Sequence, residues 1–457
     1  MFHKDEILTL DITEVNNLGC GVGRQNGIVV FVKGAVTGDR VTAKIIKTEK
    51  NYCVGRLENI LTPSPYREKK DPCVAPEACG GCVYRHVTYA HESEMKKRYV
   101  ENAFRRAGLS DVTVEDVRST GETSGYRNKA QYPFGLSGGK VRVGFYANRT
   151  HKVMPCESCA LQPRIFEEIC RFVCEFADEH GYTVYNEETG KGLLRHLYLR
   201  IGKKTGEVMV CLVINGDRIP EERKFAEELG KKFHCVKSMM LNRNERRTSV
   251  ILGEDYRTVA GHPYIEDILC GKRFRIAPAA FYQVNHDGAE LLYRIAAEKA
   301  ALADTDTLLD LYCGIGTIGI SIADVETHVV GVEIVEDAVK CARKNAEQNG
   351  LKNAEFFCGD AGDVGKAVER AMRACTDGTL TVIVDPPRRG LDMELICCLA
   401  EKKISKIVYV SCNPDTLARD CAGFRKFGYS IGEVTPVDMF PKTGHVETVV
   451  LLSMKSR

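Results

Sequence analysis

A cysteine stands at the end of an apolar run and directly before an Asn-Pro break in VSCNPDTLARD, residues 410–420. A cysteine thiolate is a strong nucleophile, and neighbouring positive charge lowers the pKa of the thiol. The helix expected after Pro414 and two basic side chains of VDPPRRG, Arg388 and Arg389, would supply that charge. We therefore expect Cys412 to have a depressed pKa and to attack a substrate. The alternative is a thiol that only packs in the core, because the chain holds 20 cysteines.

An attacking thiolate is needed when the target atom has no lone pair of its own. Carbon 5 of uracil is such an atom, since a thiol added at carbon 6 makes an enolate whose carbon 5 attacks a methyl sulfonium. The proton left at carbon 5 then needs a base. GHVETVV supplies Glu447 for that role, with His445 close by. Partial burial would raise the pKa of Glu447 toward neutrality, as a general base requires.

The segment GIGTIG, which begins at Gly314, satisfies the G-x-G-x-x-G pattern of dinucleotide sites. Asp310 before the loop favours S-adenosylmethionine instead, because a carboxylate repels a pyrophosphate and attracts an amino group. Glu333 suits ribose hydroxyls in either case, and Asp360 can accept from an adenine amine. A nicotinamide oxidoreductase is thus an alternative, as is a set of acids that merely end strands in solvent.

Regular alternation of apolar strands and amphipathic helices from residue 305 onward predicts an α/β fold with a largely parallel sheet. Ligands of such sheets lie beyond the carboxyl ends of the strands. We therefore expect one crevice to contain the residues at these ends, Asp310, Glu333, Asp360, Asp385 and Cys412.

The D-P-P of VDPPRRG leaves a second enzyme class open. It resembles the loop with which amino-methyltransferases hold an amine, although Arg388 stands where those enzymes have an aromatic residue. An adenine or small-molecule methyltransferase with an inert Cys412 is therefore an alternative. A non-catalytic RNA-binding protein is another.

Changes in composition and hydrophobic pattern along the chain predict three domains. Short β-rich runs separated by turn residues indicate a small OB-like barrel over residues 1–62, before the Pro-bearing linker LTPSPYREKKDP. Residues 63–270 mix strands and helices, which predicts an α+β central domain. Residues 271–457 contain the candidate catalytic motifs.

Composition indicates a soluble globular chain of 457 residues, with 44% hydrophobic and 28% charged residues. We expect a cytoplasmic protein with no membrane association, since no apolar run of about 18 residues and no signal-peptide core is apparent. The net charge is only +2, so a nucleic-acid partner has to be recognised through local patches. We expect a monomer without an obligate protein partner.

Three cysteines with C-x5-C-x2-C spacing, Cys73, Cys79 and Cys82, resemble a metal-ligand set. A fourth thiolate from MPCESCALQP, either Cys156 or Cys159, would complete a site for zinc or an iron–sulfur cluster. The spacing does not choose between the two metals, and unliganded thiols are the third possibility.

Five segments, in this order, resemble the signatures of the RNA (uracil-5-)-methyltransferase family: FYQVN, LDLYCGIGTIG, DPPRRGLD, SCNPDTLARD and GHVETV. The resemblance implies a Rossmann-like S-adenosylmethionine-dependent domain with Cys412 as nucleophile and Glu447 as base. Around the methyl donor or the target base it implies Gln283, Tyr312, Gly314, Glu333, Asp360 and Asp385.

The same resemblance implies an N-terminal TRAM domain and a [4Fe-4S] cluster held by Cys73, Cys79, Cys82 and Cys159. Barrel and cluster together favour 23S ribosomal RNA as the substrate, with transfer RNA as the alternative. Such an enzyme must extrude a stacked base. Phe281 and Tyr282 are the candidates for stacking, and Arg127 and Lys129 are the candidates for holding the RNA backbone.

Overall fold

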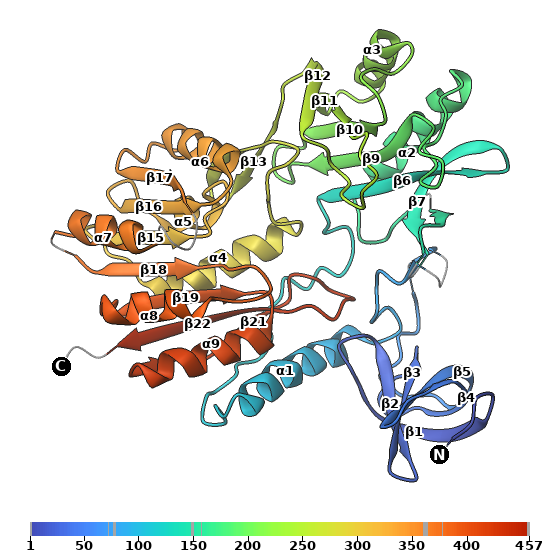
Figure 1. Cartoon of the computed structure of the whole chain (residues 1–457), viewed down its shortest axis with the longest axis horizontal. Coiled ribbons are helices and arrows are strands. Elements are labelled where there is room, and N and C mark those ends of the chain that lie inside the picture. Colours follow the sequence, from blue (N-terminus) through green and yellow to red (C-terminus); the bar gives the residue numbers. More distant parts are fainter. Residues whose placement is uncertain are drawn as a thin grey trace.

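The structure is a computed structural model of the chain, and it describes residues 2–71, 73–75, 79–147, 150–156, 158–359, 364–376 and 378–454. Three parts follow one another along the chain: a barrel, a central sheet with two helices, and a layered α/β unit (Figure 1).

The N-terminal part is a closed five-stranded barrel with strand order β1-β2-β3-β5-β4. Along β1 every second side chain from Leu8 to Ile12 is buried, because successive residues of a strand point to opposite faces. The barrel core therefore forms from alternate positions of short strands, and the barrel itself is the one that the sequence predicts. The strands are β1 (Ile7–Val15), β2 (Cys20–Gln25), β3 (Ile28–Lys33), β4 (Arg40–Thr48) and β5 (Tyr52–Thr62).

The central part is a seven-stranded sheet in the order β12-β11-β10-β9-β6-β7-β8. Helices α2 (Arg164–Glu179) and α3 (Glu222–Lys232) share one apolar core with one face of this sheet. Side chains from the other face, among them Tyr198 and Met209, pack in the same core as the α/β unit. The strands are β6 (Lys129–Ser137), β7 (Lys140–Tyr146), β8 (Val153–Pro155), β9 (Leu194–Ile201), β10 (Val208–Ile214), β11 (Val236–Arg243) and β12 (Asp255–Gly261).

The hairpin of β13 (Ile265–Leu269) and β14 (Lys272–Ile276) leads into an eight-stranded sheet. Its order is β17-β16-β15-β18-β19-β22-β20, with β21 paired to β22; β15 to β19 are parallel and β22 is antiparallel to β19. This is the largely parallel α/β sheet that the sequence predicts. The strands are β15 (Thr307–Leu311), β16 (His328–Glu333), β17 (Ala354–Cys358), β18 (Leu380–Val384), β19 (Lys406–Ser411), β20 (Tyr429–Ile431), β21 (Thr435–Val437) and β22 (Glu447–Met454).

Helices cover both faces of this sheet, and its inner strands are therefore almost completely buried and mostly apolar. One face shares a core with α4 (His286–Ala300), α5 (Thr317–Ile322) and α6 (Glu336–Gln348). The other face shares a core with α7 (Val364–Ala374), α8 (Met393–Glu401) and α9 (Pro414–Lys426).

Helix α1 (Tyr89–Arg106) also belongs to this second core, although it precedes the central sheet in the chain. Val100, Ala103 and Phe104 are buried there, and the hydroxyl of Tyr99 donates to Asp415 at the start of α9. The expected central segment, residues 63–270, therefore divides its packing between two parts of the molecule.

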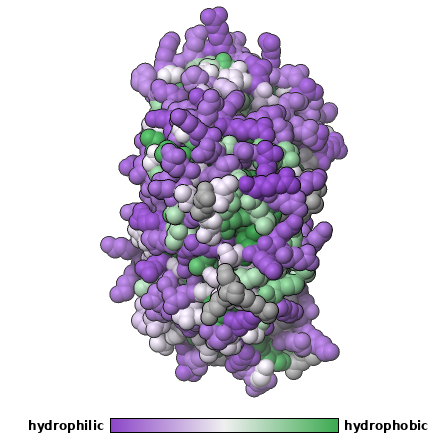
Figure 2. Space-filling model, turned by 90° about the vertical axis from the view of Figure 1, so that its left-hand side faces the viewer, coloured by the Kyte–Doolittle hydropathy of each residue, from purple (hydrophilic) through white to green (hydrophobic). Residues whose placement is uncertain are grey.

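The end of the α/β unit that lies farthest from the barrel and the central sheet is mostly hydrophilic, with a smaller apolar area near its middle (Figure 2). The parallel strands β18 and β19 point away from this end (Figure 1). Among the described residues, no helix has the length and apolar character needed to cross a bilayer.

A buried charge cluster connects α1 to the loop that precedes β22, residues 438–446, which we call the strap. The Lys96 ammonium donates to Glu92 at 2.7 Å and to Asp438 at 2.8 Å, and all three side chains are at most 1% exposed. The strap also receives hydrogen bonds from Asn285 and Tyr126, which lie in other segments. One ammonium thus joins the helix to the strap at a point from which water is excluded.

Replacing Lys96 with methionine is expected to lower the free energy of unfolding by about 3–5 kcal/mol, because two buried carboxylates lose their partner. The neighbouring Lys97→Met variant is the matched control, since Lys97 pairs with Asp116 at the surface and such pairs contribute little. Urea denaturation of both variants checks this difference. Equal losses in the two variants would contradict it.

Candidate active site

The carboxyl ends of three adjacent parallel strands meet at one edge of the α/β sheet. β15 ends next to Tyr312, β18 is followed by Asp385, and β19 is followed by Cys412. β22 begins at the same edge, because it is antiparallel to β19 and its Thr448 lies opposite Ser411. The first residue of β22, Glu447, therefore comes beside Cys412, although the two are far apart in the sequence.

The turn after Cys412 is built by Asn413. The Asn413 side chain accepts a hydrogen bond from the backbone N–H of Asp415, and Pro414 occupies the first helical turn, so α9 begins directly after the cysteine. The same side chain donates to the Arg388 carbonyl at 2.9 Å. The Asn-Pro break thus caps the helix and joins the cysteine turn to the loop after β18.

The expectation that Cys412 has a depressed pKa is wrong. Burial, together with the neighbouring Glu447 and Asp385, raises the pKa of the thiol to about 11. Arg388 lowers the pKa as expected, but its effect is smaller than those of burial and the two acids. Arg389 pairs with Asp392 instead, at 3.6 Å.

Three carboxyl groups near this sheet edge, the buried Glu447 and Asp310 and the half-buried Asp385, hold their protons to unusually high pH. Burial and the neighbouring Asp385 raise the pKa of Glu447 to about 8. Burial raises the pKa of Asp385 and of Asp310 to about 7 each. The expected shift of Glu447 toward neutrality is therefore present, and its main cause is loss of hydration.

The glycine loop after β15 is held by two acids. The Asp310 carboxylate accepts from Gly319 N–H at 2.9 Å, and Glu333 accepts from Gly314 N–H at 3.1 Å. The second oxygen of Asp310 is buried without a partner, so it is free to accept a hydrogen bond from a ligand. Tyr312, which lies between Asp310 and Gly314 in the chain, has a φ of +67°, a strained conformation for a residue with a side chain.

Of the other expected donor-site residues, Asp360 lies outside the described residues. Gln283 is 7% exposed, and its carbonyl accepts from the Asn128 side chain at 2.9 Å. It lies just before α4, whose N-cap is Asn285. The residue is thus buried at the junction between the central sheet and the α/β unit.

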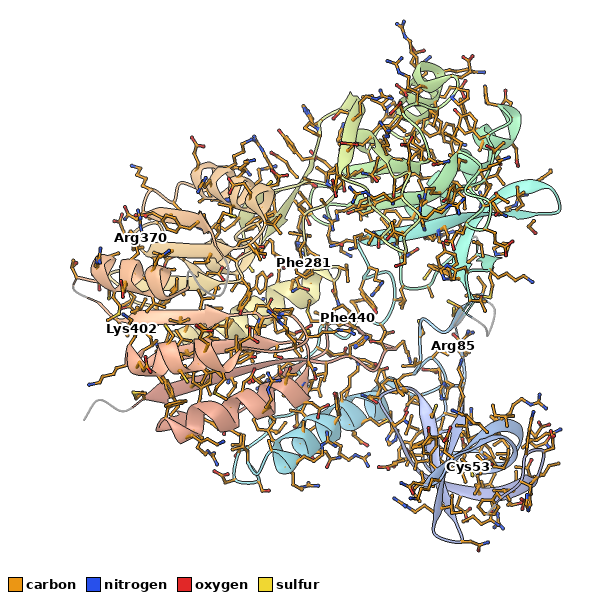
Figure 3. All side chains as sticks on the ribbon, in the orientation of Figure 1. Cys53, Arg85, Phe281, Arg370, Lys402 and Phe440 are labelled. Atoms are coloured by element: carbon orange, nitrogen blue, oxygen red, sulfur yellow. The ribbon has the colours of Figure 1, made fainter. Side chains whose placement is uncertain are left out.

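The two aromatic candidates for stacking have opposite environments. Phe281 is 65% exposed and lies between the α/β unit and the central sheet (Figure 3), so its ring is available to a ligand. Tyr282 is 1% exposed and donates its hydroxyl to Asp267 at 3.1 Å. The expectation that Tyr282 stacks on a base is therefore wrong, because its ring belongs to the core.

The cysteines of the expected metal set come together from segments far apart in the chain. Burial raises the pKa of Cys82 to about 12, and repulsion from Cys159, Cys73 and Cys79 adds to this rise. Cys156 is nearby, but its thiol donates to the Ser158 carbonyl at 3.0 Å. No three cysteine sulfurs of the described residues lie within 4.8 Å of one another.

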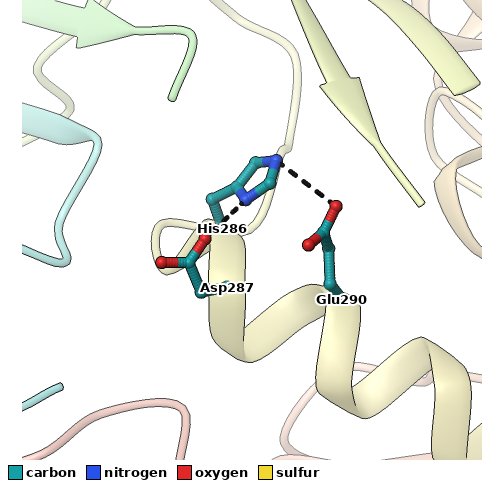
Figure 4. Close-up of side chains that lie close together, drawn as sticks. All are labelled: His286, Asp287 and Glu290. Carbon is teal, nitrogen blue, oxygen red and sulfur yellow. Dashed lines mark hydrogen bonds and ion pairs between the residues drawn. The ribbon is translucent and has the colours of Figure 1, made fainter. Parts of the chain in front are cut away.

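A second group of metal-ligand type residues, His286, Asp287 and Glu290, lies at the start of α4 (Figure 4). The His286 Nε2 lies 2.7 Å from the Ile268 carbonyl, and its Nδ1 lies 3.0 Å from Asp287. Since a carbonyl oxygen only accepts, Nε2 must carry a proton there. Both ring nitrogens are therefore engaged, and this group joins α4 to β13 instead of offering a metal site.

The sequence motifs did not reveal how the strap is held near the active site. Lys96 and Asp438 hold it, and Arg388 lies 3.4 Å from His445, which the strap carries. Burial and the positive charge of Arg388 lower the pKa of His445. In the sequence, the only local sign of this contact is that Lys96 follows Glu92 by four residues, the spacing of neighbours on one face of a helix.

Replacing Glu447 with glutamine is expected to speed alkylation of Cys412 at pH 9.5 by about threefold or more, because a carboxylate that raises the thiol pKa is removed. At pH 6.5 the two proteins should react alike, since Glu447 is then protonated and uncharged in the wild type. Mass spectrometry of iodoacetamide-treated protein measures both rates, with the exposed Cys358 as internal control. A rate that the substitution leaves unchanged at pH 9.5 would contradict the geometry.

Comparison with known proteins agrees with this geometry. The family model of tRNA (uracil-5-)-methyltransferases matches residues 88–455, and the TRAM domain model matches residues 4–57. An uncharacterized RNA methyltransferase of Bacillus cereus is 39% identical over 98% of this chain and 97% of its own. Another, from Caldanaerobacter subterraneus, is 40% identical over 97% of each chain.

A solved structure has a similar fold over almost the whole chain. It is the Pyrococcus abyssi tRNA (uracil-54, C5)-methyltransferase in complex with S-adenosyl-L-homocysteine. The TM-score is 0.78 at 29% identity, and the match covers 97% of this chain and 99% of the other. The protein belongs to the RNA (uracil-5-)-methyltransferase family: it is an S-adenosylmethionine-dependent enzyme with an N-terminal TRAM barrel.

Proposed function

We propose that this enzyme methylates carbon 5 of a uridine in 23S ribosomal RNA, with Cys412 as nucleophile and Glu447 as base. The observation that carries the proposal is the meeting of a thiol and a buried carboxyl group at one sheet edge, beside a glycine loop held by acids. The alternative of an inert Cys412 leaves Glu447 without a role, because a carboxyl with a pKa of about 8 is not needed to pack a thiol.

The proposed reaction is a sequence of bond exchanges on the uracil ring. The Cys412 thiol loses its proton to solvent, its sulfur bonds to carbon 6, and the electrons of the carbon 5–carbon 6 double bond move into the ring as an enolate. Carbon 5 takes up the methyl group as the bond between this group and the donor sulfonium breaks, which leaves a thioether. Glu447 in its ionised form then removes the proton from carbon 5, the double bond forms again, and the sulfur leaves as a thiolate.

In the free enzyme neither reacting group is yet in its reactive form. At pH 7 the Cys412 thiol keeps its proton, so it does not react with other electrophiles. Glu447 is also largely protonated in the free enzyme, which reduces its repulsion of a thiolate. Arg388 is the cation that favours thiolate formation once the crevice is closed by RNA.

For the methyl donor we propose a site made by Gln283, Tyr312, Gly314, Glu333, Asp360 and Asp385, together with Asp310. S-adenosylmethionine supplies an electrophilic methyl group when bound. The unpartnered buried oxygen of Asp310 fits its amino group, and the partly exposed Glu333 fits its ribose hydroxyls.

We propose that Cys73, Cys79, Cys82 and Cys159 hold a [4Fe-4S] cluster. Tetrahedral zinc with Zn–S bonds of about 2.3 Å would bring the sulfurs within about 3.8 Å of each other. The sulfurs of these cysteines lie in one neighbourhood, but no three cysteine sulfurs of the described residues come within 4.8 Å of one another. This wider spacing fits an iron–sulfur cluster better than a single zinc ion. We propose a structural role for the cluster, because methyl transfer needs no redox chemistry. Arg85, which lies between the barrel and the central sheet (Figure 3), donates to the Cys73 carbonyl at 3.1 Å and so helps to fix this segment.

Two RNA classes compete as substrate. The combination of barrel and cysteine set supports ribosomal RNA, through the family resemblance of these segments. Transfer RNA is the second candidate, because the solved relative is named for a tRNA and has the same overall architecture. We further propose that the enzyme acts as a monomer, with functional divisions at residues 1–62, 63–270 and 271–457.

Replacing Cys412 with alanine is expected to abolish 5-methyluridine formation, by about 10⁴-fold or more, while S-adenosylmethionine binding persists. Mass spectrometry of 23S ribosomal RNA and transfer RNA incubated with each enzyme measures the product and identifies the substrate class. Calorimetry with S-adenosylmethionine provides the control for folding. Wild-type turnover by the variant would refute the covalent mechanism.

Replacing Cys82 or Cys159 with alanine is expected to remove iron and the broad absorption near 400 nm that such clusters give, because each change deletes a thiolate ligand. Cys156→Ala is the matched control, since its thiol is hydrogen-bonded to Ser158, and this variant should keep its iron. Iron and sulfide analysis of anaerobically purified protein measures the difference. Zinc in place of iron, or loss of metal only in Cys156→Ala, would contradict the proposed ligand set.

A further inference from the structure

Two cations face each other across neighbouring strands of the central sheet. Lys129 of β6 is the register partner of Arg200 of β9, so both side chains project from the same face. Arg127 lies two residues before Lys129, and its Nε is buried without an acceptor. Like charges directly opposite one another destabilise a sheet, so this arrangement needs a compensating anion.

The described part of the chain supplies no such anion. No carboxylate there lies within 4.0 Å of Lys129, Arg127 or Arg200, whereas Lys96, which is as buried as Arg200, has two, Glu92 and Asp438. The Nε of Arg200 also lacks an acceptor, although this side chain is only 1% exposed. The protein therefore compensates one buried cation internally and leaves the other group of cations uncompensated.

The uncompensated group lies next to the exposed Phe281. The Arg200 guanidinium donates to the carbonyls of Ala277 and Ala280, at 3.4 and 2.9 Å, and so holds the segment that carries Phe281. The backbone N–H of Asn128, between the other two cations, donates to the carbonyl of Val284 on the far side of that segment. The cations and the exposed ring thus share one rigid corner of the molecule.

We propose that Lys129 binds a phosphodiester group of the RNA next to the target uridine, with Arg127 and Arg200 supplying additional positive charge. Every nucleotide of an RNA substrate carries a phosphate, and one such anion would offset the positive charges of Lys129, Arg127 and Arg200. The inference rests on the proposed function, since it presupposes an RNA substrate.

The three cations have different roles in this site. Lys129 is half-buried and can reach a ligand, whereas Arg200 is fully buried and its donors are directed at backbone carbonyls. Lys129 is therefore the contact residue, and Arg200 is a positioning residue for the Phe281 segment.

Replacing Lys129 with glutamine is expected to weaken equilibrium binding of the RNA substrate by about tenfold, as for loss of one charge-assisted hydrogen bond. The slope of log K against log salt should fall by about 0.7–0.9, the contribution of one phosphate contact. Lys140→Gln is the matched control, because Lys140 is exposed at the far end of the same hairpin, and it should change neither quantity. The probe is a 23S ribosomal RNA fragment, or a transfer RNA, that wild-type enzyme methylates, and S-adenosylmethionine affinity should be unchanged.

A second variant separates charge from shape. Burial, followed by Arg200 and Arg127, lowers the pKa of Lys129 to about 8, and no carboxylate of the described residues opposes them. Lys129 is charged below this pH and neutral above it, so wild-type RNA affinity should fall between pH 7 and pH 9.5. The Lys129→Arg variant stays charged and should lose less affinity over that range.

An unchanged affinity and salt slope in Lys129→Gln would overturn the proposal, as would equal pH dependence in wild type and Lys129→Arg. Because binding is measured directly, these outcomes differ from failure of the proposed function. That failure would appear as absence of 5-methyluridine from every RNA treated with wild-type enzyme.

Discussion

The buried ammonium of Lys96 is the interaction on which the arrangement of the active site depends. It joins Glu92 of α1 to Asp438 of the strap, where a charge without a partner would be very unfavourable. The strap leads directly into β22 and therefore sets where Glu447 begins. Its Gly444 also contacts the barrel so closely that a Cβ there would come within 1.9 Å of the Asn17 carbonyl oxygen. Barrel, helix and catalytic sheet thus meet at one short loop.

The distribution of charge divides the enzyme into two environments. Around Cys412 two acids, Glu447 and Asp385, outweigh one cation, Arg388, and burial keeps these acids largely or partly protonated near neutral pH. On the central sheet and just before it, three cations have no carboxylate partners among the described residues: Arg127, Lys129 and Arg200. The first environment suits proton transfer to and from a base, and the second suits a polyanion. The net charge of +2 is the difference between 64 basic and 62 acidic residues of the whole chain, so it does not reveal this local division.

The sequence predicted most of what depends on local pattern. Apolar strands that end in Asp310, Asp385 and Cys412 had to meet at one edge, because parallel strands share their carboxyl ends. The helix after Pro414 and the N-terminal barrel were likewise predicted from local pattern. Properties that depend on which residues lie close together in the folded chain could not be predicted in this way. The pKa of Cys412 was mispredicted because the sequence does not show how deeply the thiol is buried, and because burial, Glu447 and Asp385 together outweigh Arg388. Tyr282 was misassigned because an aromatic pair in a loop does not reveal which ring is buried.

The central claim is that the Cys412 sulfur becomes bonded to carbon 6 of the target uridine. RNA in which that uridine carries fluorine at carbon 5 tests this directly, since Glu447 cannot remove fluorine and the adduct should persist. Incubation with S-adenosylmethionine, digestion and mass spectrometry should identify a methylated fluorouridine attached to the Cys412 peptide. Methyl transfer without a covalent adduct, or an adduct on a different cysteine, would contradict the account.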